Sequence, residues 1–161
     1  MSTLVPMTIK GLMLDPISNS PIVVLKDGDE KIFLPIWVGI FEANAIALQL
    51  ENVATPRPMT HDLLRDVIAT MEAKVSRVVI SELRDSTFFA RIEMTSGERT
   101  VAIDARPSDA IALALRTETP IFVEQAVLDQ AQTISPEEDS EEKLKKWFEN
   151  LPPDELGKYK M

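Results

Sequence analysis

The chain has 161 residues, a formal net charge of −9 and 45% hydrophobic residues, a composition typical of a soluble globular protein with about one domain. It contains no cysteine, which excludes disulfides, thiolate metal sites and a cysteine nucleophile. The acidic balance argues against non-specific binding to duplex nucleic acid, because such binding depends mainly on Lys and Arg.

Two further features bear on location. The longest apolar run, residues 33–41, is about half as long as a bilayer-spanning helix, so no membrane span is expected. The N-terminal stretch MSTLVPMTIKGLML has no basic segment followed by an unbroken apolar run, so it does not predict a secretory signal. We therefore expect a cytoplasmic protein.

The first half of the chain predicts three strands and two helices. Alternating or continuous apolar residues, separated by the turn-forming stretches DPISNS and DGDE, indicate strands over 5–14, 21–26 and 31–38. Apolar residues at helical spacing indicate helices over 42–52 and 60–73, with two prolines between them. Thr60 is expected to cap the second helix with its hydroxyl.

The second half begins in the same way, with three strands followed by a helix. Strands are predicted over 74–83, 87–95, 99–104 and 119–123, with a helix over 108–116 opened by Pro107 and Ser108, and a short helix over 124–132. The pattern predicts an α+β fold with a mixed, largely antiparallel sheet and helices packed on it. NAIALQL (44–50) resembles DAIALAL (109–115) at an offset of 65 residues, which is consistent equally with a duplicated β-β-β-α unit and with convergence of two buried helices.

Composition changes towards the C-terminus. Residues 134–161 are dense in charge, and Leu144, Trp147, Phe148 and Leu151 are spaced for one apolar helix face. We therefore expect an α+β domain over 1–133 and an acidic helical tail over 134–161. The apolar face of this tail is expected to dock on its own domain or on a partner subunit.

His61, the only histidine, opens the second predicted helix together with Asp62. The positive end of the helix dipole favours the charge of Asp62 and disfavours protonation of His61. A neutral imidazole can act as a general base or bind a metal, whereas the alternative is a structural or surface histidine.

A second group of polar residues lies where a predicted strand feeds a helix, in IDARPSDAIALALR. Arg106 and Ser108 there are suited to bind phosphate, and Asp104 and Asp109 to hold Mg²⁺ or Mn²⁺. In the alternative, these residues are helix caps and ion pairs. RPMTHD and RPSD share an Arg-Pro pair followed by a hydroxyl residue and an aspartate. If the sheet brings the starts of these helices together, their polar residues would form one cluster with Glu42 and Arg57.

The sequence resembles the bifunctional nuclease domain family, formerly a domain of unknown function. The matching segments, spanning roughly Val5 to Ala131, are LPIWVGIFEANAIAL, RPMTHDLL, TFFARI and IDARPSDAIALALRTETPIFV. The resemblance implies an α+β domain, often a homodimer, and, for plant members, nuclease activity on both DNA and RNA. The residues inside the shared motifs are Glu42, Arg57, His61, Asp62, Asp104, Arg106, Ser108 and Asp109.

These observations lead to two hypotheses. In the first, the protein is a metal-assisted nuclease: Asp104, Asp109 and Glu42 hold Mg²⁺ or Mn²⁺, Arg57 and Arg106 bind the phosphate with Ser108, and His61 or Asp62 takes the proton of the attacking water. In the second, it is a non-catalytic dimeric binding or regulatory module that uses the same residues as helix caps and ion pairs.

Overall fold

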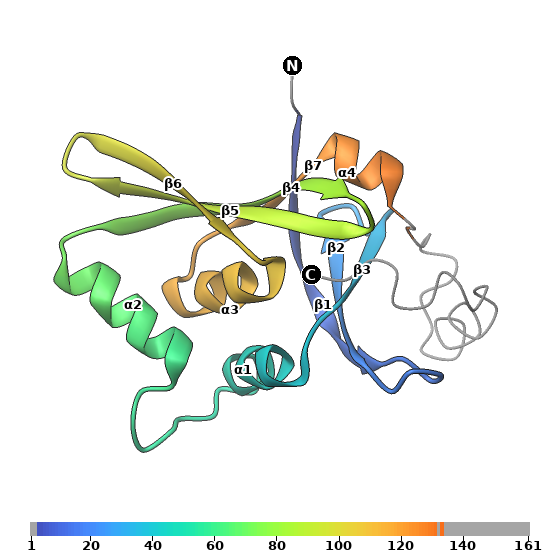
Figure 1. Cartoon of the computed structure of the whole chain (residues 1–161), viewed down its shortest axis with the longest axis horizontal. Coiled ribbons are helices and arrows are strands. Elements are labelled where there is room, and N and C mark those ends of the chain that lie inside the picture. The colour runs from blue at the N-terminus through green and yellow to red at the C-terminus, as the bar shows by residue number, and fades with distance from the viewer. Residues whose placement is uncertain (1–2, 132, 134–161) are drawn as a thin grey trace.

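The computed structural model describes residues 3–131 and 133, so the predicted tail lies outside the described residues (Figure 1). Seven strands form one sheet: β1 (Leu4–Leu14), β2 (Pro21–Asp27), β3 (Phe33–Trp37), β4 (Lys74–Arg84), β5 (Thr87–Ser96), β6 (Arg99–Ala105) and β7 (Ile121–Glu124). The four helices are α1 (Ile40–Leu50), α2 (Thr60–Thr70), α3 (Pro107–Thr117) and α4 (Gln125–Gln130). None of the helices in the described part of the chain is long and apolar enough to cross a membrane.

The strand order is β3-β2-β1-β7-β4-β5-β6, and every neighbouring pair is antiparallel except β4 with β7. The mixed, largely antiparallel α+β fold is thus confirmed. Short turns join β1 to β2 to β3 and β4 to β5 to β6, so each half of the sheet is a three-stranded antiparallel unit followed by a helix. The central strand β7 joins the two units.

The core lies between the sheet and the helices α1 and α3. Helix α3 is the most deeply buried helix because its run Ala110–Ala114 has apolar side chains on every face, and all five residues are at most 1% exposed. It packs against α1 and against strands β4 and β5. Along β5, alternate residues are buried, so the side chains of Phe88, Ala90, Ile92 and Met94 face the core.

Helix α2 contrasts with α3 because none of its residues is buried. It lies at one end of the molecule, beside α3 and away from the middle of the sheet (Figure 1). The apolar stripe predicted for this helix is present, but Leu63, Leu64, Val67 and Met71 are all exposed, and only Ile68 packs against the core. Packing of apolar side chains therefore contributes little to the position of α2.

The expected cap of α2 was wrong. Met59 holds the cap position, and Thr60 is the first helical residue. The Met59 N–H donates to Asp62 Oδ2 (3.0 Å), and a cap at Thr60 would have placed an apolar leucine where this acceptor is needed. At α3 the cap position is held by Arg106 and not by Ser108 or Asp104. The reason is that Pro107, which follows Arg106, suits the first helical position.

Candidate functional site

A groove of about 750 Å³ lies between α1, the first turns of α2 and α3, and strands β5 and β6. Most of its wall is apolar and includes Phe41, Leu64, Ile92, Met94 and Ile103. The remaining wall carries Glu42, His61, Asp104, Arg106 and Asp109. The fold therefore brings together five of the eight predicted site residues, from three helices and the end of β6.

Four of these side chains form one hydrogen-bonded chain. Asp109 Oδ1 lies 2.9 Å from His61 Nε2, and Arg106 Nε donates to Asp109 Oδ2 (3.0 Å). Arg106 Nη2 donates in turn to Glu42 Oε1 (2.7 Å). Hydrogen bonds with Glu42 and then with Asp109 raise the pKa of Arg106 above its usual value, although partial burial opposes this. The guanidinium is therefore a permanent cation between two carboxylates.

The contact with Asp109 determines what His61 can do. An ionised carboxylate only accepts hydrogen bonds, so Nε2 must carry the proton that points at Asp109. In the neutral ring the lone pair then lies on Nδ1, which has no hydrogen bond within the described residues. A carboxylate that orients an imidazole in this way is the usual support of a histidine general base.

The predicted metal site is less complete. Within residues 3–131 and 133, no three His, Asp or Glu side chains are grouped as ligands for one ion. Arg106 already forms ion pairs with Glu42 and Asp109, while Asp104 forms no ion pair in the described part of the chain. These side chains do not fit a preformed Mg²⁺ or Mn²⁺ site, and metal binding stays a prediction.

Three predicted site residues lie elsewhere. Ser108 is completely buried inside α3. Arg57 lines a separate pocket of about 330 Å³ between α1 and α2, together with Asp62 and Arg65. The carboxylate of Asp62 points to Arg116 and not into the groove, with a distance of 2.8 Å from Arg116 Nε to Asp62 Oδ1.

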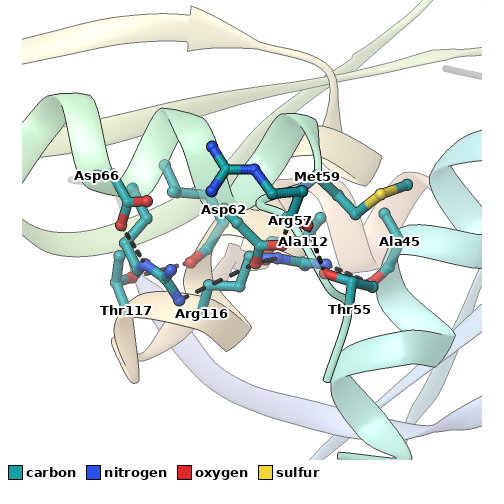
Figure 2. Close-up of polar contacts among 11 residues, drawn as sticks. Ala45, Thr55, Arg57, Met59, Asp62, Asp66, Ala112, Arg116 and Thr117 are labelled. Carbon is teal, nitrogen blue, oxygen red and sulfur yellow. Dashed lines mark hydrogen bonds and ion pairs between the residues drawn. The ribbon is translucent and has the colours of Figure 1, made fainter. Parts of the chain in front are cut away.

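Sequence reasoning missed Arg116. Its side chain is only 2% exposed, and its two terminal nitrogens donate to the carbonyl oxygens of Ala112 and Ala45, each at 2.9 Å (Figure 2). The signal was present in the sequence, since a charged residue ends the otherwise apolar run AIALALR seven positions after Asp109. The hydrogen bond from the Met59 N–H and the contacts with Arg116 lower the pKa of Asp62, against the effect of burial.

A further charged group lies on strands β4 and β5, outside the groove. Glu93 accepts hydrogen bonds from Arg77 Nε and Arg91 Nε, each at 2.8 Å. Burial acts to raise the pKa of Glu93, but the hydrogen bonds from the two arginines lower it below its usual value. This group ties the two strands together and leaves neither arginine free of a carboxylate.

Comparison with known proteins agrees with these motifs. The family model of the bifunctional nuclease domain matches residues 23–136, well over half of the chain. The chain belongs to the bifunctional nuclease domain family. All the groove residues lie within the matched range.

Relatives in this family divide into two kinds. An uncharacterized protein of Mycobacterium tuberculosis (strain CDC 1551 / Oshkosh) is 38% identical over 159 residues, which cover 92% of this chain and 95% of the relative. Bifunctional nuclease 1 of Oryza sativa subsp. japonica is 28% identical over 109 residues (66% of this chain and 33% of the plant protein). Bifunctional nuclease 2 of the same plant is 31% identical over 123 residues (72% and 38%). The chain thus corresponds to little more than a third of these plant nucleases.

Proposed function

We propose that this protein is a nuclease that hydrolyses phosphodiester bonds in DNA or RNA, with its active site in the groove between α1, α2, α3 and β6. Membership of the bifunctional nuclease domain family supports the reaction class. The observation that carries the site is the contact between His61 Nε2 and Asp109 Oδ1, because it prepares a histidine for proton transfer beside an exposed arginine.

Each residue has a role in this proposal. His61 accepts the proton of the attacking water at Nδ1, and Asp109 orients the ring and stabilises the imidazolium that forms. Arg106 contacts the scissile phosphate through Nη1, the terminal nitrogen that neither Glu42 nor Asp109 uses. Glu42 holds Arg106 in place, and Asp104 is the carboxylate left for the predicted Mg²⁺ or Mn²⁺.

The charge of the groove restricts the substrate. Glu42, Asp104 and Asp109 outnumber Arg106, so a phosphate backbone meets repulsion along with the one arginine. Much of the wall is apolar, which suits unstacked bases better than a paired duplex. We therefore expect short or single-stranded substrates, with a shallow dependence of cleavage on salt because a single arginine displaces few counterions.

A second function is favoured by the exposed apolar face of α2 and by the ion pairs that Arg106 already forms with Glu42 and Asp109. In this alternative the protein is a non-catalytic homodimer, and the hydrogen bonds among His61, Asp109, Arg106 and Glu42 only stabilise the domain. Exposed leucine, valine and methionine side chains on one helix are typical of a surface that another molecule covers. The molar mass in solution, from analytical ultracentrifugation, checks the homodimer under both functions.

The deciding experiment is cleavage of labelled single-stranded RNA and DNA by tag-free protein with Mg²⁺, Mn²⁺ or EDTA. His61→Ala and Asp104→Asn are prepared identically, and Asp29→Asn, in the exposed turn between β2 and β3, is the matched control. We expect cleavage by the wild type and the control, and none by the two groove variants. Equal cleavage in all samples would indicate a contaminant, and absence of cleavage under every condition would favour the non-catalytic module.

A further inference from the structure

Two polar contacts hold the first turn of α2 against α3. The two residues on α2 are consecutive, whereas their partners on α3 are seven residues apart. His61 meets Asp109, and Asp62 meets Arg116. Helix α2 has no buried residue, so these contacts replace the apolar packing that normally positions a helix. The order of the groups is opposite on the two helices, because a base followed by an acid on α2 faces an acid followed by a base on α3.

The spacing on α3 explains why both contacts are needed. Asp109 and Arg116 are seven residues apart, which places them on one face of α3, two turns or about 10 Å from each other. A single contact would allow α2 to pivot about it. Two contacts to residues two turns apart on α3 determine both the position and the direction of the first turn of α2, and hence where the ring of His61 lies.

Arg116 is suited to this task because its own orientation is set before it meets α2. Nη1 donates to the Ala112 carbonyl within α3, and Nη2 donates to the Ala45 carbonyl of α1 (Figure 2). Nε, on the same rigid group, donates to Asp62 (2.8 Å). The planar guanidinium is thus oriented by α1 and α3, and this orientation fixes the direction in which Nε meets α2. A lysine has a single nitrogen and cannot contact all three helices in a fixed geometry.

We propose that Arg116 is a positioning residue that acts through Asp62 to hold α2 where His61 meets Asp109. This inference rests on the proposed function of the groove, in which His61 is the general base. It also gives Asp62 a different role from the proton transfer considered for it, since both of its carboxylate oxygens are engaged by Met59 and Arg116.

The test uses His61 as a reporter, because a lone histidine gives one set of ring signals. Two-bond ¹H–¹⁵N correlations from the carbon-bound ring protons, recorded at one pH, show which ring nitrogen carries the proton. Wild type should show a protonated Nε2, and Asp109→Asn defines the signal of a ring without its carboxylate. We expect Arg116→Lys to shift towards the Asp109→Asn signal, with hydrogen exchange at least about tenfold faster in α2 and unchanged in β1 and β2.

Val23→Ala, in the buried strand β2, is the control for a merely structural effect. It should lower the melting temperature and leave the His61 signal unchanged. A wild-type ring signal and wild-type exchange of α2 in folded Arg116→Lys would overturn the proposal, and so would an equal change of the ring signal in Val23→Ala. If Arg116→Lys does not fold, Asp62→Asn takes its place with the same two outcomes.

Cleavage separates this proposal from the proposed function. If the wild type is active, Arg116→Lys should lose kcat at least about tenfold with a smaller change in KM, because the ring of His61 and not the phosphate contact of Arg106 is displaced. If neither wild type nor any variant cleaves, the nuclease function fails, while the ring signal still decides whether Arg116 positions α2.

Discussion

Replacement of Asp15 by asparagine should destabilise the protein, although the two side chains have nearly the same shape. Asp15 is completely buried in the turn between β1 and β2. Its Oδ2 accepts a hydrogen bond from Trp37 Nε1 (2.9 Å), and its Oδ1 accepts from the Ile17 N–H (2.9 Å) and the Ser18 N–H (3.3 Å). Every partner is a donor, so the amide nitrogen of an asparagine must face one of them.

The magnitude follows from these contacts. In the cheaper orientation the asparagine oxygen keeps the two backbone donors, and its NH₂ group faces the Trp37 N–H. That orientation loses one buried hydrogen bond to a charged group, which costs about 1.5–3 kcal/mol. For a domain of this size each kcal/mol lowers the melting temperature by about 2–4 °C, so the variant should melt about 3–12 °C lower.

Low pH should reduce the difference in free energy of unfolding between the wild type and Asp15→Asn. Burial acts to raise the pKa of Asp15, but the hydrogen bonds from Trp37 and from the backbone of Ile17 and Ser18 lower it more, so it lies below the usual 3.8. A carboxyl group with a lowered pKa stabilises the fold fully above its unfolded pKa, and this contribution is lost as the pH falls through the folded pKa. The stability gap should therefore be constant from pH 5 to 7 and narrow below about pH 4.

Urea unfolding at several pH values measures both effects, and a double-mutant cycle with Trp37→Phe isolates the contact. Trp37→Phe removes the donor that the asparagine cannot satisfy, so Asp15→Asn should cost less in that background. A free energy of unfolding within about 0.5 kcal/mol of wild type, or a gap that does not narrow in acid, would show that the carboxylate is not what holds this turn.

Three further changes test other parts of the structure. Gly97→Ala should cost about 1 kcal/mol in urea unfolding because Gly97 has φ of 62° in the turn between β5 and β6; an unchanged stability would mean that the turn adopts another conformation in solution. Glu93→Gln should cost about 1 kcal/mol at pH 7 and nothing well below pH 4, where the wild-type carboxyl loses its charge; a cost independent of pH would contradict the lowered pKa of Glu93. Gly39→Ala should displace the Glu42 carboxylate, which occupies the position of the added methyl group, and so weaken its contact with Arg106. A crystal structure of this variant with the Glu42–Arg106 contact intact would refute that reasoning.

Local pattern was sufficient for most of the elements. The strands β4 and β5 and the helices α1 and α3 were predicted within a few residues because their apolar residues recur at strand or helix spacing, which depends only on neighbours in the chain. The cap of α2 was missed by one residue, since Thr60 has the favoured side chain for a cap but the Asp62 carboxylate accepts the hydrogen bond from the Met59 N–H.

The groove was predictable in part. RPMTHD and RPSD drew attention to His61, Arg106 and Asp109, and the structure brings all three together. The same reasoning gave Arg57 the place of a phosphate ligand, whereas it lines a different pocket, and it passed over Arg116 as the end of an apolar helix. A motif identifies residues of the right chemistry and does not show the direction in which each side chain points.

The sequence by itself determined the class of fold, the family and most of the charged residues of the groove, because these depend on composition and on spacing along the chain. The tertiary structure alone decided which charges meet. His61 and Asp109 are 48 residues apart, Asp62 and Arg116 are 54 apart, and Glu42 and Arg106 are 64 apart. Contacts over such separations depend on how the sheet places α1, α2 and α3, and a side chain takes the partner that this packing brings within about 3 Å.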